Sequence, residues 1–239
     1  MTRFPIQGVG SGGGQGGGGV ERENVASPND DFWIYDEFFY PTFSDIGLHL
    51  ENVQASGSVP SGVGGLDQQN TNAVNNNDTR LNTCGAGGVA IDISKKAILK
   101  WRARMTVDNA FTAFICGFVV GGDGPQAPFP YVNKPGPIIT FFYEGTGGAS
   151  GNIDTYSATA PGGVNEEQTD TGVAMGTGFH TYEIEVDSGT ITYKIDGNIV
   201  KVQTTNIPTG ILGAWIGVQN GTTASRGIVI DSWFMFNSR

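Results

Sequence analysis

The chain has 239 residues, of which 15% are charged and 38 are glycine, and its formal net charge is −10. This length accommodates one large all-β domain, and the composition favours strands and turns over long amphipathic helices. The acidic balance excludes nucleic acid as a partner, because binding to phosphates requires clustered lysine and arginine. No stretch approaches the roughly 20 apolar residues of a membrane-spanning helix, so we expect no membrane partner.

Residues 1–30 form an arm that is rich in glycine. Between Gly8 and Gly19, nine of twelve positions are glycine, and ordering such a segment costs roughly 1–2 kcal/mol of backbone entropy per residue. Few side chains can offset this cost within the same domain, so we predict that the arm becomes ordered on a neighbouring protein, with a flexible linker as the alternative. The predicted partner-binding residues are its apolar anchors and part of its glycine tract: Phe4, Ile6, Val9, Gly12, Gly13, Gly14 and Val20.

Residues 31–239 are predicted to form one β domain. A long Asn- and Gly-rich loop is expected at about 55–82, either as a second contact segment or as a solvated insertion. Period-two alternation and short β-branched or aromatic runs predict the strands, which are 33–40, 88–94, 97–107, 110–120, 137–145, 152–159, 180–188, 190–197, 198–205, 211–220 and 227–236. Ser188–Gly189 and Asp196–Gly197 predict tight hairpin turns. We therefore expect an all-β fold of two antiparallel sheets packed face to face.

Several residues in the central strands have specific expected roles. Lys100, Arg102 and Arg104 alternate with apolar residues, which places the three charges on one sheet face, either as a solvated outer face or as an anion site. Cys116 lies in the apolar run AFICGFVV and is expected to be a buried free thiol. In the proline-rich segment that follows, Phe129 and Tyr131 are predicted to contact a partner subunit, with a sugar site as the alternative.

The C-terminal third contains FHTYEIEVDSGTITYKIDGNIVKVQTTNIP, then LGAWIGVQNG and IVIDSWFMF. This series resembles the end of a concanavalin A-like jelly roll, the superfamily of laminin-G-type modules, legume-type lectins and family-16-type glucanases. The opening DDFWIYDEFF also resembles the first strand of that fold, which implies pairing with the last strand. The resemblance covers roughly 31–45 and 97–239, and it implies a fold but no single function.

No motif for catalysis or metal binding emerges from the sequence. The glucanases of the superfamily carry Glu-x-Asp-x-(x)-Glu on one strand, and this chain offers only Glu183, Glu185 and Asp187, whose order differs and whose strand is not the one implied; we interpret them as a solvated strand face. His49 and His180 lack neighbours at metal-ligand spacing. We therefore expect no enzyme activity, no cofactor and no metal.

Two further types of ligand follow from the resemblance. Some members of the superfamily hold structural calcium, for which Asp231, with Asp31, is the position to consider; an Asp bonded to a turn is the alternative. Lectin-like sites use exposed aromatic rings, but Trp33, Trp101 and Trp215 lie in predicted strands and are expected to be core residues.

The arm, the acidic domain and the N-terminal MTRFPIQGVG, which lacks the apolar core of a secretory signal, together resemble head or decoration proteins of tailed bacteriophages. We predict a structural protein made in the host cytoplasm and located on the outer capsid surface of the virion. Its expected partners are the major capsid protein or other virion subunits, and copies of itself, with a trimer as one arrangement. The alternative is a carbohydrate-binding, lectin-like module, with a glycan as the ligand.

Overall fold

The computed structural model describes residues 32–36, 51–54, 67–70, 78–83, 90–106, 112–120, 137–144, 151–160, 164–220 and 227–238. The secondary structure of these residues consists of fifteen strands, and every pairing between strands is antiparallel. Among the described residues, no helix is long and apolar enough to cross a bilayer.

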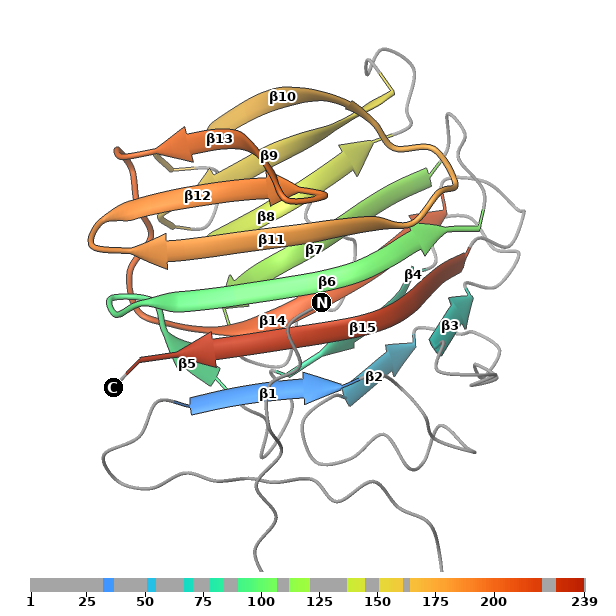
Figure 1. Ribbon diagram of the computed structural model, residues 1–239, viewed down its shortest axis with the longest axis horizontal. Coiled ribbons are helices and arrows are strands. Elements are labelled where there is room, and N and C mark those ends of the chain that lie inside the picture. Colours follow the sequence, from blue (N-terminus) through green and yellow to red (C-terminus); the bar gives the residue numbers. More distant parts are fainter. Residues whose placement is uncertain are drawn as a thin grey trace, which may run out of the picture.

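The first sheet has seven strands in the order β1-β15-β6-β11-β12-β13, and β3 also pairs with β15. It faces the viewer in Figure 1. Its strands are β1 (Phe32–Asp36), β3 (Asp67–Asn70), β6 (Ala97–Met105), β11 (His180–Asp187), β12 (Thr190–Ile195), β13 (Asn198–Gln203) and β15 (Gly227–Asn237).

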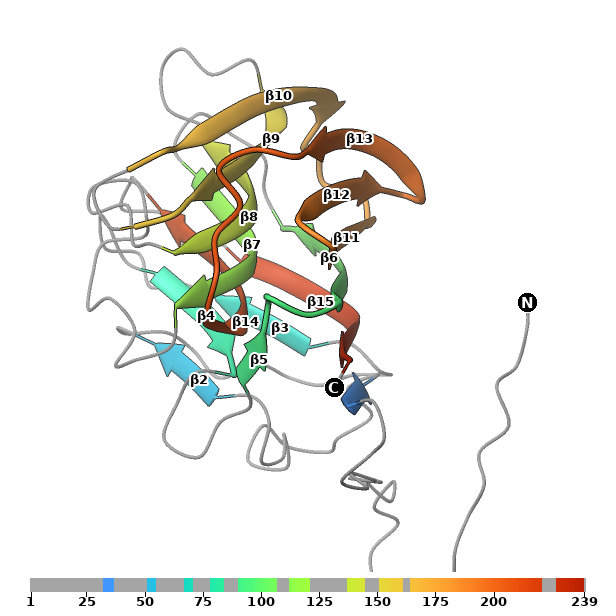
Figure 2. The same ribbon diagram turned by 90° about the vertical axis from the view of Figure 1, so that its left-hand side faces the viewer.

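The second sheet has eight strands in the order β10-β9-β8-β7-β14-β4-β2, and β5 also pairs with β14. The two sheets form separate layers, which Figure 2 shows from the side. The strands of the second sheet are β2 (Glu51–Gln54), β4 (Asp78–Asn82), β5 (Ala90–Asp92), β7 (Thr112–Val120), β8 (Ile138–Glu144), β9 (Asn152–Ala158), β10 (Glu167–Ala174) and β14 (Ile211–Asn220). The predicted fold class, an all-β sandwich of two antiparallel sheets, is confirmed.

The core lies between the sheets because alternate residues of each strand point inward. In β6, Leu99, Trp101 and Met105 are buried, whereas Arg102 between them is exposed. Aromatic rings link the layers: the Phe141 ring of the second sheet packs on Tyr182 and Tyr193 of the first at centroid distances of 5.5 and 5.4 Å. Such contacts contribute roughly 0.5–1.5 kcal/mol each beyond the buried area.

Two predicted features are confirmed: the two tight hairpin turns, and the pairing of the first strand with the last. The turns after β11 and β12 have positive φ at both central residues, 50° and 74° at Ser188 and Gly189, and 52° and 81° at Asp196 and Gly197. This conformation matches the twist of the flanking strands. In addition, the first strand, β1, pairs with the last strand, β15.

The strand pattern differs from the prediction in four places, because β2, β3, β4 and β10 were not expected. Of these, β3 and β4 lie inside the segment 55–82, which was predicted to be a loop. Their sequences, DQQN and DTRLN, are polar and carry no apolar alternation. They are strands because their backbones pair with β15 and β14, a long-range effect that local composition does not encode. The proposed domain boundaries stay a prediction.

Candidate functional site

The nine partner-binding residues expected from the sequence lie outside the described residues. They are the arm positions Phe4, Ile6, Val9, Gly12, Gly13, Gly14 and Val20, together with Phe129 and Tyr131. His49 and Asp31 also lie outside. The expected roles of these residues stay predictions.

The expectation that tryptophans belong to the core is confirmed for two of the three named. Trp101 and Trp215 are 1% and 3% exposed, and Trp101 stacks on Trp233 with a centroid distance of 5.3 Å. Trp33 lies in β1, where its backbone pairs with Phe236. Cys116 is the buried free thiol that was expected, and burial raises the pKa of that thiol. Neither Trp101 nor Trp215 offers an exposed ring to a sugar.

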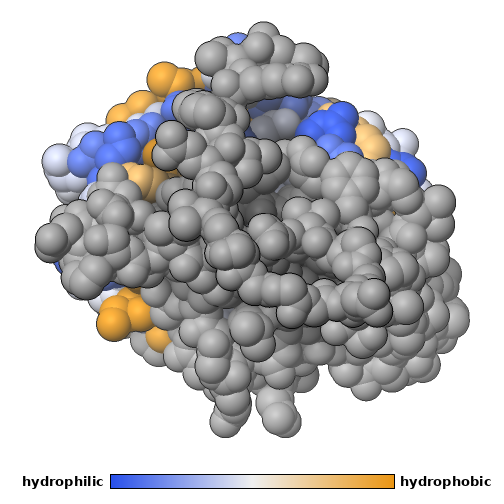
Figure 3. Space-filling view, turned by 60° about the horizontal axis from the view of Figure 1, so that its bottom comes forward, coloured by the Kyte–Doolittle hydropathy of each residue, from blue (hydrophilic) through white to orange (hydrophobic). Residues whose placement is uncertain are grey.

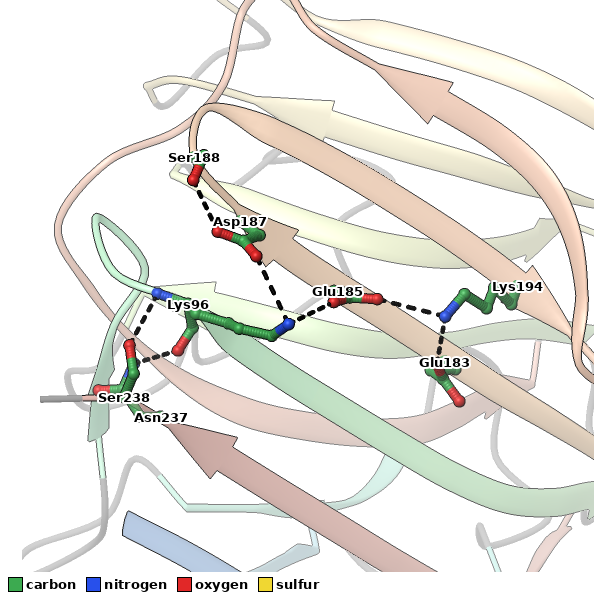
Figure 4. A network of polar contacts seen from close by, with 8 residues as sticks. All are labelled: Lys96, Glu183, Glu185, Asp187, Ser188, Lys194, Asn237 and Ser238. Carbon is green, nitrogen blue, oxygen red and sulfur yellow. Dashed lines mark hydrogen bonds and ion pairs between the residues drawn. The ribbon is translucent and has the colours of Figure 1, made fainter. Parts of the chain in front are cut away.

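The three carboxylates of β11 lie on the outer face of the first sheet, as interpreted from the sequence. Lys194 on the neighbouring strand binds two of them, with its Nζ 2.7 Å from an oxygen of Glu183 and 3.2 Å from one of Glu185. Lys96 binds Glu185 and Asp187 at 2.9 and 3.4 Å. Figure 4 shows this ladder of alternating charges, which runs from Lys96, just before β6, over β11 to Lys194 of β12.

The electrostatics of the ladder do not suit catalysis. Desolvation raises the pKa of Glu183, but the hydrogen bonds and charges of Lys100 and Lys194 outweigh it, so its pKa lies below the usual value. The hydrogen bond from Lys96 leads the causes that lower the pKa of Glu185. A glycosidase needs one carboxyl group that stays protonated, which requires a raised pKa. The ladder is therefore a structural network.

The residue considered for calcium has a different partner. Asp231 is the extra residue of a β-bulge in β15, and its carboxylate forms an ion pair with Arg102 of β6. Among the described residues, no group of three or more His, Cys, Asp or Glu side chains could hold a metal ion. Among the described residues, the partner of the Asp231 carboxylate is therefore Arg102.

The outer face of the second sheet has a buried apolar centre. Ile115 and Val119 of β7 alternate with Phe114, Cys116 and Phe118, which face the main core, so they lie on the opposite side of the sheet. They belong to a second cluster whose members are 0–4% exposed: Ile115, Val119, Ile138, Tyr156, Ala158 and Trp215.

Gly117 occupies the middle of this face, between Trp215 of β14 and Thr140 of β8 in the cross-strand register. A Cβ atom there would lie 2.2 Å from the backbone oxygen of Ile139 and 2.6 Å from the Cα of Thr140. Only glycine fits this site, because the backbone of β8 occupies the space that a side chain would need, and the position is buried beside Trp215.

Polar side chains gather at the edge of the same face, on β9 and β10. Asp154 shares its side of the strand with Tyr156, and its cross-strand partner is Asp170. The amide of Gln168 donates to Asp154 at 2.6 Å, and the amide of Asn152 donates to both oxygens of Asp170 at 3.1 and 3.2 Å. Gln168 and Asp170 are exposed. We call these four residues the amide–carboxylate rim.

One further contact fixes a rim residue, and a second lies beside the rim. The backbone N–H of Gly172 donates to Asp170 at 2.7 Å, which fixes that carboxylate. The Tyr156 hydroxyl donates to exposed Glu166 at 3.2 Å. Desolvation, with the Glu166 charge, raises the pKa of Tyr156, so the hydroxyl remains a donor at neutral pH.

Sequence reasoning missed this rim. NIDTYSAT was predicted to be a strand, but β10 was not predicted, and the rim exists only because the two strands pair. In the sequence, Gln168, Asp170 and Gly172 occupy alternate positions. The exposure of β10 follows the same alternation, because these three residues are more exposed than their neighbours. Their polar character concealed the strand.

Comparison with known proteins identifies the fold. No family model and no curated protein matches the chain. Among solved structures, it is similar to the carbohydrate recognition domain of Emp47p (TM-score 0.61, 12% identity, 87% of this chain and 95% of that chain). It is also similar to a β-glucanase of Bacillus licheniformis (0.57, 12%, 87% and 98%) and to the laminarinase catalytic domain of Thermotoga maritima (0.60, 12%, 88% and 100%).

These identities show the fold alone, which is the concanavalin A-like lectin/glucanase jelly roll expected from the C-terminal residues. Both enzymes and carbohydrate recognition domains adopt it, so the fold is compatible with carbohydrate binding and does not itself separate binding from hydrolysis.

Proposed function

We propose that this protein is a carbohydrate-binding module that does not hydrolyse its ligand, and that the amide–carboxylate rim of β9 and β10 is its binding site. The observation that carries the proposal is the pairing of Gln168 with Asp154 and of Asn152 with Asp170 on one exposed edge. The likeness of the fold to a carbohydrate recognition domain supports it.

The chemistry of the rim fits vicinal hydroxyl groups. Each sugar hydroxyl is both a donor and an acceptor, and an amide beside a carboxylate presents both complementary functions. Hydrogen bonds within the rim hold the side chains in place before a ligand arrives, which reduces the ordering cost of binding. Hydrogen bonds to a charged carboxylate are also about twice as strong as neutral ones.

The described side chains at the centre of the same face argue against hydrolysis. Cleavage of a glycosidic bond requires two carboxyl groups that flank the bond. At the centre of β7, β8 and β14, the outward positions carry no carboxyl group, whereas the last residue of β8, Glu144, continues the same alternation; the central positions are Ile115, Gly117, Thr140, Phe142 and Trp215. Ile115, Thr140 and Trp215 are also buried, so the centre of this face offers a ligand neither a carboxyl group nor an open surface.

The test is binding to soluble neutral polysaccharides, namely laminarin, lichenan and mannan, measured by calorimetry with the full chain. We expect Asp170→Asn combined with Gln168→Ala to weaken the affinity at least tenfold, or about 1.4 kcal/mol. Asp187→Asn, an identical charge change on the other sheet, is the matched control and should bind like the wild type. Binding that survives the double variant, or release of reducing ends during incubation, would contradict the proposal.

An assembly role on a virion is the second candidate function, and the composition of residues 1–30 favours it. A segment with nine glycines in twelve positions gains order by docking on a partner surface. The partner would be the major capsid protein or another virion subunit, and a glycan site on the domain would then face outward. The two functions are compatible, because they use different parts of the chain.

A further inference from the structure

Two arginines of the first sheet share one aromatic ring. Arg102 and Arg104 point outward from β6, while Trp101, Ala103 and Met105 are buried. Phe179 directly precedes β11, and because His180 pairs with Ala103, the register places Phe179 beside Arg104. The guanidinium carbons of Arg102 and Arg104 lie 4.6 and 5.2 Å from the Phe179 ring centroid.

Most of the described charged side chains on this face form ion pairs, and Arg104 does not. Lys96, Lys100 and Lys194 bind Glu183, Glu185 and Asp187, and Arg102 binds Asp231. Among the described residues, no carboxylate lies within ion-pair distance of Arg104. Its contact there is the Phe179 ring, which attracts the guanidinium without satisfying its N–H donors.

An arginine whose guanidinium is positioned by a ring contact is preorganised to bind an anion. Its planar fork matches the two oxygens of a carboxylate, and the ring contact removes part of the rotamer freedom that binding would otherwise cost. The site offers the charge of Arg104, which has no ion-pair partner among the described residues, next to the Arg102–Asp231 pair; the charge of Arg102 also acts on the Asp196 carboxylate. A monoanionic carboxylate matches this charge, whereas a dianionic phosphate would bring a second negative charge toward Asp231.

We propose that Arg104, positioned by Phe179 and flanked by Arg102, binds a carboxylate group of an acidic ligand. The site lies on the outer face of the first sheet, whereas the amide–carboxylate rim lies on the outer face of the second, so the proposal is independent of the neutral-glycan site. The ligand we assign is a uronic acid residue of a polysaccharide, which the likeness of the fold to a carbohydrate recognition domain favours over an acidic side chain of a protein.

The experiment uses the full chain labelled with ¹⁵N and follows the arginine Nε–H signals during titration with trigalacturonate or with a hexaglutamate peptide. Maltotriose is the uncharged probe. We expect the Arg104 signal to shift with trigalacturonate and to stay unchanged with maltotriose. A shift with the hexaglutamate peptide alone would overturn the assignment to a uronic acid and indicate an acidic protein segment instead.

The variants separate a specific site from general charge. Arg104→Gln should weaken binding at least tenfold, whereas Lys95→Gln, which removes the same charge from an exposed turn residue before β6, should leave it within twofold. Phe179→Leu keeps both arginines and should weaken binding severalfold, since it removes only the ring that positions them. The absence of binding with trigalacturonate, or equal losses in the Arg104 and Lys95 variants, overturns the proposal.

Discussion

Asp196 illustrates at the residue scale how one side chain closes a hairpin. It lies at a turn position with φ of 52°, a conformation that Asp and Asn tolerate better than other residues. Its carboxylate lies 2.7 Å from His180 Nδ1 and accepts the Thr181 N–H at 2.8 Å. Desolvation raises the pKa of Asp196, but these hydrogen bonds and the charges of His180 and Arg102 outweigh it, so the pKa is lowered.

The lowered pKa predicts a pH-dependent contribution to stability. A carboxylate whose folded pKa is below the unfolded value of about 3.9 stabilises the protein above that value, and the contribution is lost as the pH falls through the folded pKa. We expect Asp196→Asn, which retains the turn preference, to lower the free energy of unfolding by roughly 1 kcal/mol at pH 7. Urea unfolding from pH 7 to pH 2 should show this difference disappear at the acid end; a difference that is constant across the range would contradict the explanation.

At the scale of elements, the pairing of β7 with β8 depends on one glycine. Gly117 lies where the two backbones approach so closely that a Cβ atom would overlap the Ile139 carbonyl oxygen at 2.2 Å. β7 lies between β8 and β14 in the second sheet, with Gly117 opposite Thr140 on one side and Trp215 on the other. A side chain at position 117 would push β7 and β8 apart. Both strands contribute side chains to the packing on each face of the sheet.

Gly117→Ala is therefore expected to destabilise the protein by roughly 3 kcal/mol or more, at the severe end for point substitutions. Gly178→Ala is the matched control, because nothing lies within 4 Å of the position that a Cβ atom would take there and no positive φ constrains it. Thermal unfolding followed by circular dichroism should show a large decrease in Tm for the first variant and a small change for the second. Similar Tm values for the two variants would show that the strands can move apart at low cost.

At the scale of the whole molecule, the described charges are unevenly distributed. Most of the described lysines and arginines lie on the first sheet or at its edges, where Lys201 of β13 pairs with Glu167 of β10 at 2.8 Å, whereas Arg80 belongs to β4 of the second sheet. The outer face of the second sheet carries Asp154, Asp170 and nearby Glu166 among its described side chains. Apolar exposure is limited to separate positions such as Ile199 and Ile211, and Figure 3 shows small hydrophobic patches among hydrophilic ones on the described surface in that view.

The proposed assembly role makes a prediction at this scale. Deleting residues 1–20 should abolish co-sedimentation with assembled particles, because the apolar anchors Phe4, Ile6 and Val9 are removed, together with Val20. The Tm of the domain should change by no more than a few degrees, since both sheets are built from later residues. An unchanged particle-bound fraction in the truncated protein would exclude the arm as the attachment segment.

The sequence alone determined the fold class and most of the strands. Alternation along 97–105 and the dipeptides Ser188–Gly189 and Asp196–Gly197 are local signals, and they correctly predicted β6 and two hairpins. The outward placement of Lys100, Arg102 and Arg104 followed from the same alternation. Local signals suffice here because side-chain direction and turn conformation depend on neighbouring residues.

Only the tertiary structure decided which side chains meet. Asp231 pairs with Arg102 from 129 positions away, and Asp154 lies opposite Asp170 because β9 and β10 pair in one register. A shift of one residue would turn every side chain of a strand to the other face. The polar strands β3 and β4 likewise depend on partners that are distant in sequence. The amide–carboxylate rim and the Arg104 site are therefore products of strand pairing, which no local pattern in the sequence specifies.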